Sequence, residues 1–383
     1  MTTKSKEIRM VDTITQYHHI KDEVDAAVSA VVASGMYING PAVKQFRASL
    51  GEYLGASKVI ACGNGTDALQ VALMALDLAP GDEVITSPFT FFATAEVIAL
   101  LGLVPVFVDI ETDTYNLDPT KIEAAITDRT RCIMPVHLFG HVAHMEPIME
   151  LAEQHKLYVI EDAAQSIGAD YIFSDGRRQK AGLVGHIGCT SFYPSKNLGA
   201  YGDAGAIYTN DEALGDRCQI VCNHGSHKRY HHSRIGVNSR LDSIQAAILD
   251  VKLRHLDAYN HARQTAAATY DELLAGVDGL IRPHRAPYQT HVFHQYTLRV
   301  EEGRAKRDAI QAQLRERSIP SMVYYPIPLH LQEAYAPYGF KHGDMPVAEQ
   351  YSAEVISLPM HSELDREQLE YIAQNFLDVY HKN

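Results

Sequence analysis

Short apolar runs alternate with amphipathic segments between residues 58 and 209, and this alternation restricts the fold more than any other feature of the sequence. The apolar runs have the length of β-strands and fall at residues 58–62, 83–87, 104–109, 131–137, 157–161, 189–192 and 206–209. The segments between them begin helices near Gly65, Thr90, Pro119 and Met145. Continuous apolar strands that alternate with helices are typical of a mainly parallel sheet covered on both faces. The sequence therefore predicts an α/β fold whose ligands bind at the carboxyl ends of the strands.

The chain is long enough for two domains, because 383 residues exceed what one hydrophobic core usually organises. We expect a large domain over residues 1–250 and a smaller α+β domain over residues 251–383, connected by a long helix at about residues 243–270. Further strands are predicted near residues 292–300 and 321–324. An amphipathic N-terminal helix, residues 19–34, is a candidate to pack on the small domain.

Charge and cysteine content exclude several classes of protein. The 47 acidic residues outnumber the 34 basic ones, and a net charge of -13 argues against nucleic acid or an anionic membrane as the main partner. The five cysteines are scattered and form no C-x-x-C pair, so neither a zinc site nor redox chemistry is indicated. No apolar stretch has the length of a membrane span or of a signal-peptide core. We therefore expect a soluble, cytoplasmic protein with reduced thiols.

One lysine stands out as a candidate nucleophile. Lys196 lies in the segment TSFYPSKNLG, residues 190–199, between apolar residues and a glycine-rich tail. A lysine that is partly desolvated on such a turn has a lowered pKa and can form a Schiff base. A solvated loop lysine would have the same local sequence, so Lys196 alone does not decide between the two interpretations.

Two further features support the catalytic interpretation of Lys196. The apolar run at residues 157–161 delivers an acid, Asp162, to the carboxyl edge of the predicted sheet. Gly65 and Thr66 open a helix whose free amides and positive end would stabilise a phosphate. A phosphate cradle, an acid for a ring nitrogen and a Schiff-base lysine are what pyridoxal 5′-phosphate needs. An aromatic ring such as Phe91, which follows another strand, could lie flat on that cofactor.

Four motifs in this order resemble the DegT/StrS-type nucleotide-sugar aminotransferases, from about residue 10 to the end of the chain. The motifs are Gly65-Thr66, EDAAQS at residues 161–166, SFYPSK at 191–196 and VNSRLD at 237–242. The resemblance implies the aspartate-aminotransferase-like fold type I of pyridoxal-phosphate-dependent transferases. It also implies a homodimer whose active sites lie at the subunit interface.

The resemblance assigns a role to each motif residue. Lys196 would form the Schiff base, and Asp162 would pair with the ring nitrogen of the cofactor. Gln165 would bond the ring hydroxyl, and Phe91 would stack on the ring face. The phosphate ligands would be Gly65, Thr66 and Ser191 of one subunit and Asn238 of the other.

The substrates implied by the resemblance are an amino-acid donor, glutamate in our interpretation, and a nucleotide-linked ketosugar, with pyridoxamine 5′-phosphate between the two half-reactions. The branch that this sequence most resembles aminates C3 of a UDP-linked 2-acetamido-3-keto-hexuronic acid for surface polysaccharides such as lipopolysaccharide. In that branch a histidine often precedes the tyrosine of a Tyr-Pro-Ile-Pro stretch, and here Tyr324 takes its place. A sister branch that aminates dTDP-3-keto-6-deoxyhexoses is therefore the alternative. The candidate substrate contacts are Arg229, Tyr230, His231, Arg240, Tyr324 and Tyr325.

Three other readings compete with transamination. His137, His141 and His144 fall at short spacings, but no Cys, Asp or Glu completes a familiar zinc set, so we expect no metal. A sensor or regulator could keep the fold without turnover. A sugar dehydratase of the same family usually has histidine at the lysine position, and Lys196 argues against it.

Overall fold

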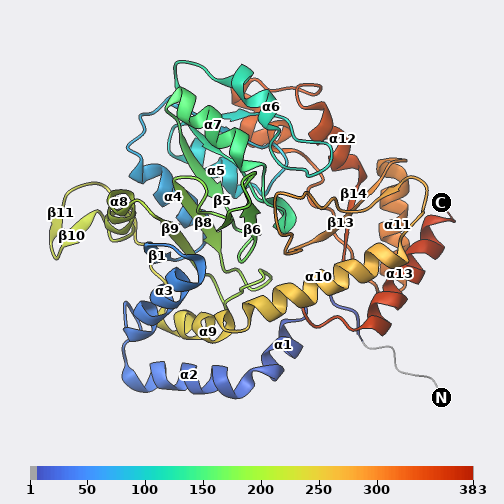
Figure 1. The fold of residues 1–383 in the computed structure, drawn as a ribbon, viewed down its shortest axis with the longest axis horizontal. Coiled ribbons are helices and arrows are strands. Elements are labelled where there is room, and N and C mark those ends of the chain that lie inside the picture. Colours follow the sequence, from blue (N-terminus) through green and yellow to red (C-terminus); the bar gives the residue numbers. More distant parts are fainter. Residues whose placement is uncertain (1–6, 383) are drawn as a thin grey trace.

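The structure is a computed structural model that describes residues 7–382. Its centre is a seven-stranded sheet with the strand order β1-β9-β8-β5-β4-β2-β3 (Figure 1). Only β9 runs antiparallel to its neighbours in this sheet, so the predicted mainly parallel sheet is confirmed. The strands are β1 (Lys58–Cys62), β2 (Glu83–Thr86), β3 (Val104–Phe107), β4 (Thr130–Met134), β5 (Tyr158–Asp162), β8 (Ile187–Ser191) and β9 (Gly205–Thr209).

Helices cover both faces of this sheet, which is why its strands are apolar on both sides. In β9, for example, Ile207 packs into one hydrophobic cluster while Ala206 and Tyr208 pack into another on the opposite face. Helices α4 (Gly65–Ala75), α5 (Ala93–Leu100) and α8 (Glu212–Cys222) contribute to the first cluster. Helices α3 (Pro41–Leu54), α7 (Met145–His155) and α9 (Ser243–Leu253) cover the other face.

The C-terminal part has its own sheet and core. Three antiparallel strands, β12 (Leu280–Ile281), β13 (Tyr296–Val300) and β14 (Val355–Leu358), pack against α10 (Leu256–Leu273), α11 (Arg304–Glu316) and α13 (Arg366–Tyr380). The strand predicted at residues 321–324 is wrong, because only Met322 pairs with β14 before prolines interrupt the segment. Helix α12 (Pro346–Glu354) leads into β14. The division into domains at residue 250 stays a prediction.

One predicted helix is broken in the structure, and another is preceded by a short helix that was not predicted. The predicted helix at residues 243–270 is α9 followed by α10, with Arg254 and His255 between them. The N-terminal helix predicted at residues 19–34 corresponds to α2 (Lys21–Ser34), which follows the short helix α1 (Thr13–His19), and α2 packs on α9 through Val24 and Val251. No helix within residues 7–382 combines the length and the apolar character needed to cross a membrane.

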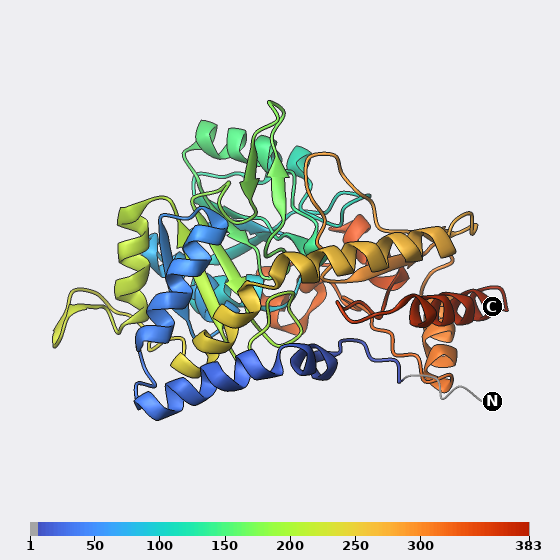
Figure 2. The same cartoon turned by 60° about the horizontal axis from the view of Figure 1, so that its bottom comes forward.

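Several short elements connect these layers. The hairpin β10 (Ser226–Lys228) and β11 (His231–His232) projects beyond α8, away from the rest of the chain (Figures 1 and 2). A second hairpin consists of β6 (Asp170–Ile172) and β7 (Arg178–Lys180). The remaining helical turns are α6 (Pro119–Ile122) and 3-10 turns at Glu123–Ala125, Leu138–Gly140, Leu329–Leu331 and Glu333–Tyr338.

Candidate active site

Lys196 lies in the turn that follows β8, at the carboxyl edge of the parallel strands. Its backbone N–H donates to the carbonyl of Tyr193 at 2.8 Å, which closes the turn. The side chain is half-buried. This desolvation lowers the pKa of Lys196 to about 8, although the nearby Asp162 carboxylate opposes the shift. A larger fraction of the amine is therefore neutral near pH 7 than in an exposed lysine, as a nucleophile requires.

Asp162 is the last residue of β5 and is only 5% exposed. Burial raises the pKa of its carboxyl group, and two hydrogen bonds oppose this rise by stabilising the charged form. The Thr94 hydroxyl donates to Oδ2 at 2.8 Å, and the Ala164 N–H donates to Oδ1 at 3.2 Å. Thr94, in the first turn of α5, was missed by the sequence analysis. Its only signal in the sequence was its place in the segment that follows β2, shortly after the aromatic residues at 91–92.

The amide of Gln165 has a defined orientation. Its Oε1 accepts the N–H of Phe139 at 2.6 Å, so its Nε2 points to the Tyr325 hydroxyl, 3.2 Å away. The hydrogen-bond network thus fixes which end of the amide carries the donors. A donor at this place suits an anionic ring oxygen, as the expected cofactor would present.

The N-terminus of α4 forms a cradle in which only glycine fits. A Cβ atom at Gly65 would lie 2.6 Å from Cβ of Ser191, at the end of β8. A Cβ atom at Gly205 would lie 2.4 Å from the carbonyl oxygen of Asn64. The ends of β8 and β9 thus press against the first turn of α4, where Thr66 follows Gly65 and the helix dipole favours an anion. The cradle, Asp162 and Lys196 together fit pyridoxal 5′-phosphate.

A second lysine with a lowered pKa, Lys252, is the alternative to Lys196 as a reactive amine. Lys252 on α9 is only 1% exposed, and burial, together with the charge of Arg263, lowers its pKa to about 7. Its ammonium donates to the carbonyl of Gly199 and lies 5.2 Å from the centroid of the Tyr201 ring. Lys252 therefore anchors the tail of the Lys196 segment instead of facing a ligand. The signal in the sequence was a lysine among the apolar residues of α9.

Several of the predicted substrate and cofactor contacts are exposed in the single chain. The predicted residues on the projecting hairpin β10–β11 are exposed, with Tyr230 at 80%. Phe91, before α5, is also 59% exposed. The hairpin residues predicted as substrate contacts are Arg229, Tyr230 and His231. Their roles stay predictions.

The segment with Asn238 and Arg240 lies beside the α4 N-terminus of its own chain. Ser239 donates to Asp67 in the first turn of α4 at 2.6 Å and accepts the N–H of Gly63 at 3.0 Å. Arg240 is half-buried next to it, while Asn238 is exposed. The role expected for Asn238, as a ligand of the phosphate in the partner subunit, stays a prediction.

The histidines considered as metal ligands have other contacts. His137 bonds Glu161, and the ring of His144 stacks on Tyr288 with centroids 4.5 Å apart. His141 is buried next to His291. Among residues 7–382, no group of three His, Cys, Asp or Glu side chains could hold a metal ion.

Comparison with known proteins identifies the family. Residues 18–377 match the DegT/DnrJ/EryC1/StrS aminotransferase family. The chain is 47% identical to a "Pleiotropic regulatory protein" from Geobacillus stearothermophilus, over 97% of this chain and 98% of the relative. It is 45% identical to the UDP-2-acetamido-2-deoxy-3-oxo-D-glucuronate aminotransferase of Pseudomonas aeruginosa, over 95% of this chain and 98% of the relative.

The solved structure of S. venezuelae DesV in complex with a ketimine intermediate is also similar. It superposes with a TM-score of 0.92 at 40% identity and covers 98% of both chains. This similarity confirms the predicted fold type I. Related solved structures in pyridoxamine-phosphate and pyridoxal-phosphate forms confirm the predicted cofactor. The chain therefore belongs to the DegT/DnrJ/EryC1/StrS aminotransferase family.

Proposed function

We propose that this protein transfers an amino group from L-glutamate to the 3-keto carbon of a UDP-linked 2-acetamido-2-deoxy-3-oxo-hexuronic acid. The observation that carries aminotransfer is the convergence of Lys196, Asp162 and the α4 cradle at one edge of the sheet. The name of the Pseudomonas relative supports this choice of sugar. A role in surface polysaccharide synthesis would follow from that substrate.

Pyridoxal 5′-phosphate, when bound, supplies an electron sink for the carbon that loses its proton and a carrier for the amino group. In our proposal Lys196 holds the cofactor and afterwards moves a proton with its Nζ, because its lowered pKa of about 8 permits both proton states near neutral pH. Asp162 stabilises a protonated ring nitrogen with its buried carboxylate. Gln165 holds the ring oxygen through Nε2, with Tyr325 beside it. Gly65, Thr66 and Ser191 bind the phosphate.

The substrate side of the proposal depends on a second copy of the chain. Arg240 lines a groove of about 540 Å³ together with Lys44, Arg47 and His227. This basic groove suits a diphosphate or a sugar carboxylate. The hairpin with Tyr230 projects away from the rest of its own subunit (Figure 2). We propose that it covers the active site of the partner subunit in a homodimer. Tyr324 and Tyr325 would contact the sugar.

The experiment that tests this proposal supplies purified protein, cofactor and ¹⁵N-labelled glutamate to a small panel of ketosugars. The panel contains the UDP-linked 3-keto-hexuronate and a dTDP-linked 3-keto-6-deoxyhexose. We expect mass spectrometry to find the labelled amine only in the hexuronate. Omission of cofactor, and glutamine or alanine as donor, are the controls. Product only from the deoxyhexose would reverse the choice of substrate.

The dTDP-linked 3-keto-6-deoxyhexose is the second candidate substrate. Tyr324 stands where a histidine often occurs in the hexuronate branch, and another relative is named a dTDP-3-amino-3,4,6-trideoxy-alpha-D-glucose transaminase. The first relative is named as a regulatory protein, so a role without turnover is the candidate from another class. Cofactor binding without amination of any ketosugar in the panel would favour it.

A further inference from the structure

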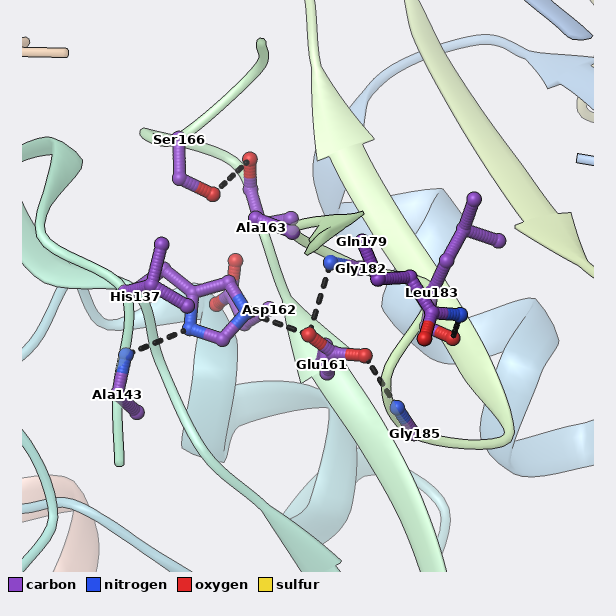
Figure 3. Close-up of polar contacts among 12 residues, drawn as sticks. His137, Ala143, Glu161, Asp162, Ala163, Ser166, Gln179, Gly182, Leu183 and Gly185 are labelled. Carbon is purple, nitrogen blue, oxygen red and sulfur yellow. Dashed lines mark hydrogen bonds and ion pairs between the residues drawn. The ribbon is translucent and has the colours of Figure 1, made fainter. Parts of the chain in front are cut away.

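A fully buried pair, Glu161 and His137, lies behind the cofactor-facing residues of the proposed site. Both side chains are 0% exposed, and Oε2 of Glu161 lies 2.7 Å from Nε2 of His137 (Figure 3). Glu161 precedes Asp162 in β5, so the two carboxylates point to opposite faces of the sheet. The pair therefore does not reach the cofactor side itself.

The hydrogen bonds define the proton positions in this pair. The N–H of Ala143 donates to Nδ1 of His137 at 3.1 Å, so the ring carries its proton on Nε2 and donates it to Glu161 (Figure 3). Glu161 also accepts the N–H groups of Gly182 and Gly185. A group that accepts three hydrogen bonds and donates none is an ionised carboxylate. A neutral imidazole thus faces a buried negative charge.

His137 also connects this charge to Asp162. Its backbone N–H donates to the carbonyl of Asp162 at 3.0 Å, while the N–H of Asp162 donates to the carbonyl of Pro135 at 2.9 Å. The ring and the backbone of His137 therefore hold two consecutive residues of β5. A shift of His137 would therefore break contacts with the strand end that carries Asp162.

The same histidine anchors the loop at residues 138–143. One end of this loop follows His137 in the chain, and the other returns to its ring through Ala143. Between them, the N–H of Phe139 orients Gln165 at 2.6 Å. Asp162 and Gln165, the two residues proposed to hold the cofactor ring, are thus connected to one buried unit.

We propose that Glu161 is a positioning residue that acts through His137 to orient Asp162 and Gln165, and that its charge stabilises a cation on the cofactor side. This inference rests on the proposed function and deepens it. An amide at position 161 would keep one acceptor oxygen but would place an NH₂ group against one of the three donors. Glu161→Gln therefore removes the charge and disturbs the contacts at nearly constant volume.

The test uses the holoenzyme of Glu161→Gln. The cofactor attached to Lys196 absorbs visible light, and this absorbance changes with pH. The pH at the midpoint of that change reports the charge around the cofactor and can be measured without any sugar. We expect this midpoint to move to lower pH by at least about 0.5 unit, because loss of a buried negative charge destabilises the cation. We also expect kcat to fall about 10- to 100-fold, the usual effect of losing a supporting partner, with KM for the ketosugar almost unchanged. The titratable groups that interact with Lys196 are Asp162 and His294, and both stay in place in this variant.

Glu83→Gln is the matched control. Glu83 is a buried carboxylate in the same sheet, and it also accepts three hydrogen bonds, from Thr127, Arg129 and Thr130. It begins β2 and so lies at the opposite edge from the site. We expect its variant to lose thermal stability but to keep the midpoint and kcat.

A Glu161→Gln variant that loses stability like the control, yet keeps the wild-type midpoint and kcat, would overturn the inference. If Glu161→Gln does not fold, His137→Gln decides, because it keeps the charge of Glu161 and a donor to it but loses the acceptor for Ala143. We expect that variant to keep the wild-type midpoint of the absorbance titration and to have a lower kcat. An unchanged kcat would overturn the inference. A wild type that shows the chromophore but aminates no ketosugar would contradict the proposed function, while the midpoints still test Glu161.

Discussion

Removal of the Thr94 hydroxyl tests how the protein keeps Asp162 charged. Thr94 is 1% exposed, and its Oγ1 donates to Oδ2 of Asp162 at 2.8 Å. A hydrogen bond to a charged group contributes about 1.5–3 kcal/mol. Thr94→Val has nearly the same shape but leaves that oxygen without this donor, so the desolvation that raises the pKa of Asp162 is less opposed.

If the whole contribution acts on the proton-transfer step, the rate falls by about 10- to 150-fold, since 1.4 kcal/mol corresponds to a factor of ten. The assay is a single turnover with the amino donor alone, followed by the visible absorbance of the cofactor. Thr94→Ser, which retains the hydroxyl, is the control and should stay within about threefold of the wild type. A Thr94→Val enzyme with the wild-type rate would refute the reasoning.

Three further predictions concern the cradle, the substrate groove and acid stability. Gly65→Ala places a Cβ 2.6 Å from Cβ of Ser191, so we expect cofactor affinity, measured by absorbance titration, to fall at least about tenfold; an unchanged affinity would argue against the cradle. Arg240→Ala should raise KM for the nucleotide sugar about tenfold or more without slowing the donor half-reaction, and a change confined to the donor half-reaction would contradict its proposed role. Burial and the charge of Arg263 lower the pKa of His361 to about 4, whereas the pKa in the unfolded chain is roughly 6.5. The contribution of His361 to the free energy of unfolding is therefore complete above pH 6.5 and is lost as the pH falls towards 4. Between pH 7.5 and 5 the free energy of unfolding should fall by about 2 kcal/mol through this residue. Urea unfolding of His361→Gln should therefore show a correspondingly smaller fall over this pH range than the wild type.

The strands of the main sheet could be predicted from the sequence because they are buried on both faces. Residues 58–62 coincide with β1, and the other predicted strands overlap their observed counterparts to within a few residues. Strand order and the antiparallel direction of β9 could not be predicted, since they depend on pairing between distant segments. The break between α9 and α10 was missed because only Arg254 and His255 separate the two helices. Both residue types are common in helices, and no proline or glycine marks the break.

The cofactor-facing candidates were accessible from the sequence because each lies at or just beyond the end of a strand, or begins a helix. Lys196, Asp162 and Gly65 all lie at such positions. Thr94 and Lys252 were missed, because a threonine inside a helix and a lysine on an apolar helix face acquire their meaning only from tertiary contacts. The same holds for the 2.7 Å contact between Glu161 in β5 and His137, which follows β4.

The central claim is that the amine of Lys196, and no other, holds the cofactor. Borohydride reduction of the pyridoxal-phosphate form, followed by proteolysis and mass spectrometry of the peptides, tests it most directly. We predict the reduced cofactor on Lys196, in the segment between Pro194 and Gly199. Cofactor on Lys252, whose pKa is lowered to about 7 by burial, or on an exposed lysine would contradict the account.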